Sequence, residues 1–133
     1  MYRLFTLEEA TTLLPVVDCN VGEMQEAIRD MNNLRELLKS LRSKSLQAQN
    51  LAREIGFLVT VIRERKVELD KLGVQLHDIE SGLVDFPSQL GAEMILLTWE
   101  RGQNAITHFK RMTGDSTPQP LPHADNNSFV AKA

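Results

Sequence analysis

The sequence predicts a mainly α-helical fold of the α+β class, in which a long antiparallel helical hairpin precedes a small extended or β-hairpin region. Two apolar stripes that step by three and four residues predict the helices, and a change of period after Gly73 predicts the extended region. The first stripe comprises Val17, Val21, Met24, Ile28, Met31, Leu34, Leu38 and Leu41, and the second comprises Leu51, Ile55, Leu58, Ile62, Leu69 and Leu72.

A capping box marks the first helix start. In the segment Thr6-Leu7-Glu8-Glu9, the threonine hydroxyl can accept the Glu9 amide while the Glu9 carboxylate reaches back. We therefore expect a helix to begin at Leu7. Proline is unfavourable inside a helix and favourable in a first turn, so we expect this short helix to end or bend near Leu14 and the next to begin at Pro15.

The two stripes predict two long helical segments, and the polar stretch 40–50 between them breaks the phase of the pattern. One interpretation is a hairpin that turns near residues 43–45, which the matched lengths and the phase slip favour. The other is a single helix of about 57 residues, roughly 85 Å long, which the lack of glycine or proline at the turn favours. We expect the hairpin. Gly73 then takes the C-cap of the second helix.

The chain after Gly73 reads as extended. Residues 74–77 alternate in polarity, Pro87 favours an extended Phe86, and Met94–Trp99 is an apolar run of strand length. A turn at 102–104 would return the chain as a strand over 106–109. A helix over 94–112 is the alternative, since its apolar residues also fit a helical face.

The chain has 133 residues, and we expect one domain over 1–112 followed by a disordered tail over 113–133, where three prolines lie among polar residues. A formal net charge of −3 argues against a basic nucleic-acid-binding face. No apolar stretch approaches the ~20 residues that span a membrane. A single cysteine, Cys19, allows no intrachain disulfide and suits the cytoplasm.

Three stretches together resemble an uncharacterised bacterial family, the domain of unknown function 2203. They are Arg3–Ala10 with Leu13-Leu14-Pro15, then Leu72–Val74 through Gly82–Pro87, then Leu97–Trp99 with Gly102. The resemblance implies two long helices followed by a small extended region, and implies no activity. The family pattern has a cysteine where this chain has Thr98, and a Trp-His pair and a Gly-Phe-x-Gly-Arg segment that this chain lacks. A site built on those groups is not expected here.

Candidate chemical groups are few. Neither His77, His108 nor His123 has a glutamate three positions before it, which argues against a helical di-iron site. His77, Asp85 and His108 are weak candidates for metal ligands, because such carboxylates more often cap turns. No catalytic residue and no cofactor are predicted.

Other polar groups have ordinary structural explanations. Cys19 could act as a nucleophile with a histidine base, but a small buried helical thiol is the simpler expectation. Glu8 and Glu9 are explained by capping, and the mixed charges of Arg63–Lys66 by a solvated helix face.

Two functions fit these observations. The first is a small helical interaction or assembly protein without catalytic activity, which forms a homodimer, or binds another protein, through a coiled-coil or four-helix arrangement, ferritin-like in shape. Phe57, Val59 and Val61 widen the second stripe beyond what one seam buries. The alternative is a small-molecule or metal-binding protein, or an enzyme, with a site between the helices and the extended region.

Overall fold

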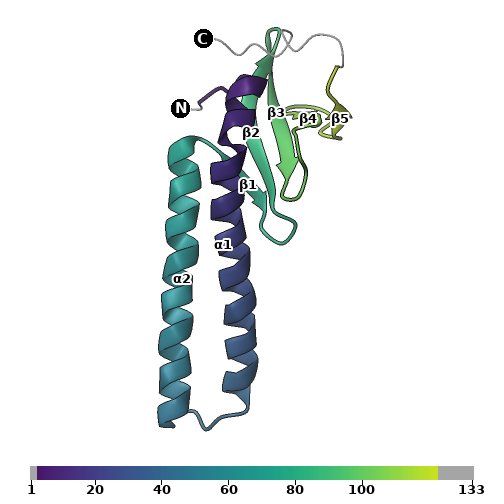
Figure 1. The fold of residues 1–133 in the computed structure, drawn as a ribbon. Helices are drawn as coiled ribbons and strands as arrows, with labels where there is room; N and C mark the ends of the chain where they lie inside the picture. The colour runs from purple at the N-terminus through teal and green to yellow at the C-terminus, as the bar shows by residue number, and fades with distance from the viewer. Residues whose placement is uncertain (1–2, 123–133) are drawn as a thin grey trace.

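The computed structural model describes residues 3–122 and consists of two antiparallel helices and a five-stranded antiparallel sheet (Figure 1). The elements follow the chain as α1 (Leu7–Lys39), α2 (Leu46–Leu72), β1 (Gln75–Asp78), β2 (Leu83–Leu90), β3 (Glu93–Glu100), β4 (His108–Arg111) and β5 (Gln119–Pro120). The strands are hydrogen-bonded in sequence order, so the sheet is a simple meander. It lies beside the N-terminal half of α1, and the hairpin continues beyond it.

The extent of the sheet corrects the predicted fold class. The small β-hairpin region is wrong, because β2 and β3 are eight-residue strands that pair along their whole length, from Leu83 opposite Glu100 to Leu90 opposite Glu93. A ferritin-like fold or a bundle is not what the chain forms, since the sheet rather than further helices covers α1. The alternative of a helix over 94–112 is also wrong. The chain is therefore α+β with a substantial sheet.

Helix α1 begins at the predicted capping box but does not stop at Pro15. Thr6 accepts from the Glu9 amide, and the Glu9 carboxylate accepts from the Thr6 amide at 2.8 Å. The predicted end or bend near Leu14 is wrong, because the helix runs on to Lys39 with Pro15 inside it. Pro15 is exposed, whereas the core residues Ala10, Leu14, Val17 and Val21 lie on one face on both sides of it. Their burial offsets the backbone hydrogen bond that proline removes.

The helices separate between Lys39 and Leu46, so the single-helix alternative is wrong. Serine supplies both caps in place of glycine or proline: Ser40 caps α1, and the Ser45 hydroxyl accepts the Ala48 amide at 3.1 Å. Gly73 caps α2 in a left-handed conformation with φ of 88°, as predicted.

The core lies between α1 and the inner face of the sheet. Strand residues that alternate in sequence point inward, and those fully or nearly buried are Val84, Phe86, Ile95, Leu97, Trp99 and Phe109. From the helices, Val17, Val21 and Leu69 join them. The main core cluster therefore draws on the part of the hairpin beside the sheet, and farther towards the tip the buried apolar residues are Ala27, Met31 and Ala48.

The stretch expected to be a disordered tail contains β5, which pairs with β4 through Phe109 opposite Gln119. The Leu121 amide also donates to the Thr107 carbonyl at 2.9 Å. Residues 123–133 lie outside the described residues. Within the described part of the chain, neither helix combines the length and apolarity needed to cross a membrane.

Candidate functional site

The outer face of the sheet carries the residues that the sequence singled out. Gln75 lies opposite Asp85, Asp85 opposite Thr98, and Thr98 opposite His108. Because directly opposite residues of antiparallel strands share a face, these four form one row across the sheet. Alternation along β4 puts Lys110 on the same face as His108.

Asp85 is buried in that row, and one of its two carboxylate oxygens contacts positively charged or ring nitrogen atoms. Its side chain is 5% exposed, and Oδ2 lies 3.3 Å from Lys110 Nζ and 3.6 Å from His77 Nδ1. Its Oδ1 is buried and finds no hydrogen-bond partner among the described residues. Burial raises the pKa of the Asp85 carboxyl, and the charges of Lys110 and then His77 act against that rise. The structure thus encloses a carboxyl group whose loss of hydration on burial is only partly offset by the positive charge of Lys110.

The structure brings together two of the three predicted metal ligands. His77 reaches Asp85, helped by a bulge in β1 between Leu76 and Asp78. His108 is separated from Asp85 by Thr98 in the row, and its Nδ1 lies 2.8 Å from the Thr107 hydroxyl oxygen. Over residues 3–122, no group of three histidine, cysteine or acidic side chains could hold a metal ion.

Sequence reasoning missed Lys110, whose ammonium group is what faces the Asp85 carboxylate. The signal was available, since Lys110 lies two residues after His108 and directly follows the strand expected over 106–109. An ammonium group at 3.3 Å already supplies positive charge beside this carboxylate, which makes it less suited to a further cation.

Cys19 lies on the exposed side of α1, so the expected buried thiol is wrong. Its Sγ donates to the Glu23 carboxylate one helical turn later, at 3.5 Å. A neighbouring carboxylate does not favour a thiolate, and a nucleophilic role gains no support.

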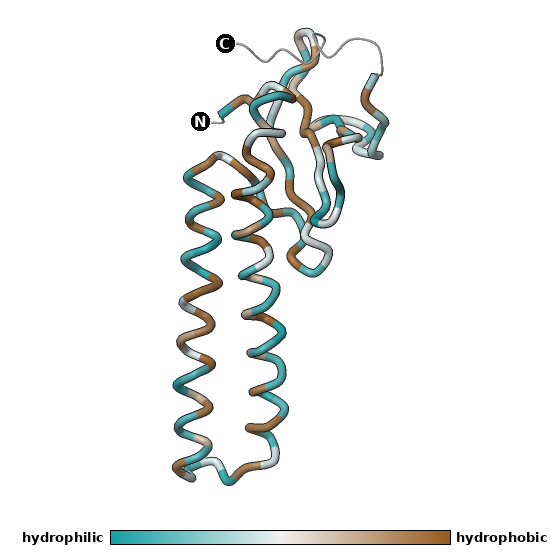
Figure 2. Tube along the Cα trace, in the orientation of Figure 1, coloured by the Kyte–Doolittle hydropathy of each residue, from teal (hydrophilic) through white to brown (hydrophobic). Residues whose placement is uncertain are grey.

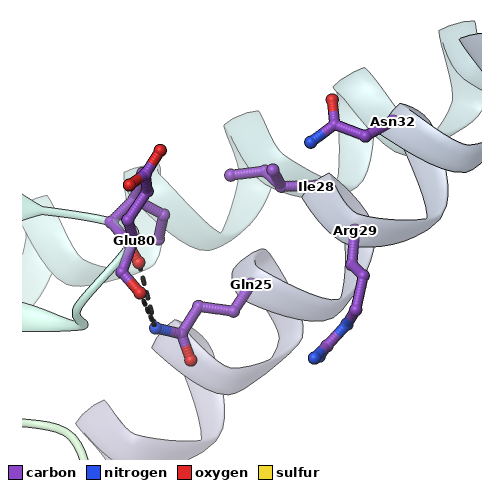
Figure 3. Close-up of a pocket in the computed structure, with 6 residues that line it drawn as sticks. Gln25, Ile28, Arg29, Asn32 and Glu80 are labelled. Carbon is purple, nitrogen blue, oxygen red and sulfur yellow. Dashed lines mark hydrogen bonds between the residues drawn. The ribbon is translucent and has the colours of Figure 1, made fainter.

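A hollow of about 320 Å³ lies where the β1–β2 turn meets α1 (Figure 3). Gln25, Ile28, Arg29 and Asn32 line it from the helix, and Ile79 and Glu80 line it from the turn. Gln25 holds the turn in place, because its Nε2 donates to the carbonyl oxygens of Ile79 at 3.0 Å and Glu80 at 3.2 Å. Among residues 3–122, the Glu80 carboxylate and the Asn32 side-chain amide make no hydrogen bond.

Arg101 ties the same turn to α1 from the other side. Its Nη1 donates to Gln25 Oε1 at 3.2 Å, and its Nε donates to Asp18 at 2.9 Å. Glycine makes room for this arrangement, because a Cβ at Gly22 would lie 2.7 Å from the Arg101 guanidinium. At Gly82, φ is +75° and a Cβ would lie 2.7 Å from Arg101 Cβ. The sequence motif that begins at Gly82 therefore starts with a residue that this contact requires.

A second hollow of about 400 Å³ adjoins the first and shares Ile28 and Ile79 with it. We call it the junction groove. Its lining comes from α1, α2, β1 and the β1–β2 turn and comprises Met24, Ile28, Val59, Ile62, Arg63, Lys66, Leu76 and Ile79. Six of these eight side chains are apolar and two are cationic.

The far half of the hairpin carries two further hollows between the helices. One of about 300 Å³ is lined in part by Leu37, Leu41 and Leu51, and one of about 380 Å³ in part by Leu34, Phe57 and Leu58. We call these six residues the distal strip. Leu37 is 56% exposed and Phe57 is 67% exposed. The apolar stripes in the sequence already indicated this surface.

Comparison with known proteins identifies a family and nothing further. The family model described as uncharacterised conserved protein, DUF2203, matches residues 3–115, which confirms the resemblance seen in the sequence. Neither a curated protein nor a solved structure matches the chain.

Proposed function

We propose that this chain, which belongs to the DUF2203 family of uncharacterised conserved proteins, is an assembly protein that pairs with a second copy through its helical hairpin. The two copies meet at their distal strips, in a symmetric contact that each copy makes with the same surface. The proposed setting is the cytoplasm, since the single cysteine allows no intrachain disulfide.

The burial of α2 is the observation that carries this proposal. Only Ala48 and Leu69 of its 27 residues are buried, although apolar residues recur along its whole length (Figure 2). The sheet covers neither the distal strip nor the tip of the hairpin, which leaves Phe57 and Leu37 more than half exposed. A second copy would remove this surface from water, at roughly 25 cal/mol per Å² of apolar area.

The charges along α1 favour a second copy in the opposite orientation. In its middle, acidic residues outnumber basic ones, with Asp18, Glu23, Glu26 and Asp30 against Arg29; in its last turns and the connection to α2, basic residues outnumber acidic ones, with Arg35, Lys39, Arg42 and Lys44 against Glu36. In an antiparallel pair related by a two-fold axis, the basic tip of each hairpin lies against the acidic middle of the other. Complementary charges of this kind select partner and register.

Sedimentation velocity on charged variants tests the proposal. Phe57→Glu and Leu37→Glu each place a charge in the distal strip, so each is expected to sediment as a monomer at concentrations where the unmutated chain is dimeric. Val67→Glu is the matched control, because Val67 is also an exposed apolar residue of α2 (43%) but lies outside the strip. If both strip variants keep the sedimentation coefficient of the unmutated dimer, with helix content retained by circular dichroism, the strip is not the interface.

A further inference from the structure

The junction groove has an apolar floor that three parts of the chain supply. Met24 and Ile28 come from α1, Val59 and Ile62 from α2, and Leu76 and Ile79 from β1 and its turn. Except for Met24, these side chains are only partly buried, so they still present apolar surface to solvent. A volume of about 400 Å³ lies in the usual range of small-molecule sites.

A cationic rim runs along α2 beside this floor. Val59, Ile62, Arg63 and Lys66 are three or four residues apart and therefore share a face of the helix. Lys66 donates to both carboxylate oxygens of Asp70 at 3.2 Å. Arg63 makes no side-chain hydrogen bond or ion pair within the described part of the chain. The planar Arg63 guanidinium therefore has its hydrogen-bond donors available, and it can bind a carboxylate through two parallel hydrogen bonds.

The wall of the groove is fixed before any ligand arrives. The β1–β2 turn that carries Ile79 is hydrogen-bonded to Gln25 (Figure 3). Gln25 Oε1 in turn accepts from Arg101 Nη1. Arg101 itself is bonded to Asp18. A preformed wall lowers the entropic cost of binding.

From these contacts we propose that the junction groove binds a free single-chain amphiphile with an anionic head group, of the fatty-acid carboxylate class. The alkyl chain lies on the apolar floor beside Ile28 and Ile79, and the carboxylate accepts hydrogen bonds from Arg63. This site uses none of the residues of the distal strip and is independent of the proposed assembly.

Isothermal titration calorimetry of the full chain with monomeric dodecanoate, below its micelle concentration, tests this inference. We expect one equivalent per chain and no comparable binding of dodecyltrimethylammonium, which has the same chain and the opposite charge. Arg63→Gln should weaken dodecanoate binding about tenfold, since a hydrogen bond to a charged group is lost. Arg53→Gln, on the same helix but away from the groove, should leave it unchanged.

A second pair of variants separates the groove from the distal strip. Val59→Asp places a negative charge on the floor and should abolish dodecanoate binding, whereas Phe57→Asp should retain it even if it disrupts the dimer. Amide chemical shifts of Ile28 and Ile79 should move on titration. Equal binding of the two amphiphiles, or unchanged affinity in Arg63→Gln, would show adsorption without a site and overturn the proposal. Arg63-dependent binding to anionic phospholipid vesicles without binding of free dodecanoate would overturn it in favour of a membrane surface.

Discussion

The backbone amide of Phe5 donates to the carbonyl oxygen of Pro87 at 2.7 Å, which joins the segment before α1 to the middle of β2. The Ser88 hydroxyl donates back to the Phe5 carbonyl at 2.5 Å, and the rings of Phe5 and Phe86 meet edge to face at 5.4 Å. β1 pairs with β2 only as far as Asp85, so the Phe5 segment takes the place beside Pro87 that β1 leaves open.

Removing the Phe5 ring should therefore destabilise the whole fold. Phe5 is fully buried, and Phe5→Ala is expected to lower the free energy of unfolding by about 3–5 kcal/mol. Urea denaturation followed by circular dichroism measures it. Arg3→Ala is the control, because it removes only an exposed guanidinium, which lies over the Phe5 ring and donates to the Leu72 carbonyl at 3.2 Å, and it should cost clearly less than Phe5→Ala. A loss below 1 kcal/mol for Phe5→Ala would mean that the segment is not part of the cooperative fold.

Gly82→Ala should be more costly than Gly91→Ala, although both glycines have positive φ. Gly91 faces open space, so alanine there meets only the left-handed penalty of about 1–2 kcal/mol. At Gly82 the added Cβ also meets Arg101 and Gln25, which adds an overpacking cost of about 1–3 kcal/mol. Thermal unfolding of the two variants provides the comparison. Equal melting temperatures would show that the Arg101 contact imposes no constraint.

The unmutated chain should lose stability relative to the Asp85→Asn variant as the pH rises. Burial raises the pKa of the Asp85 carboxyl in the folded state. The folded state then holds this proton more firmly than the unfolded state, and the stabilisation from protonation is lost as the pH rises through the folded pKa. We expect the stability of Asp85→Asn minus that of the unmutated chain to grow from about pH 4 to pH 7. Urea midpoints across this range measure it, with Asp30→Asn as the exposed control. A difference that shrinks as the pH rises would contradict the assignment.

Reversing the charge at the hairpin tip should weaken the proposed dimer. Arg42→Glu with Lys44→Glu places acid against the acidic middle of the partner's α1, and like charges there oppose association. Sedimentation equilibrium should give a larger dissociation constant for the double variant, and the difference should shrink at high salt. A dissociation constant equal to that of the unmutated chain would argue against the antiparallel orientation.

The sequence predicted the parts of the fold that rest on periodicity. The two apolar stripes, of which the second includes Leu51–Ile62, each identified one helix. The capping box placed the start of α1 at Leu7. Pro15 led to the wrong prediction of a helix end near Leu14. The apolar side chains on the opposite face of α1 are buried against the sheet, and their burial outweighs the local cost of proline. The length of β2 was missed because Pro87 usually breaks a strand, and here a segment more than 80 residues away completes the pairing.

The candidate sites were less predictable, because they depend on side chains from distant elements. The pairing of Asp85 with Lys110 follows from strand register, which composition does not reveal. The junction groove depends on Gln25 reaching the β1–β2 turn across 54 residues of sequence. Neither Lys110 nor Gln25 belongs to a sequence motif with a known chemical role.

The molar mass of the unmutated chain in solution tests the central claim most directly. Multi-angle light scattering at tens of micromolar should give twice the 15.0 kDa of one chain, with the mass falling on dilution as a two-fold dimer dissociates. A stable mass of one chain at that concentration would contradict pairing through the hairpin.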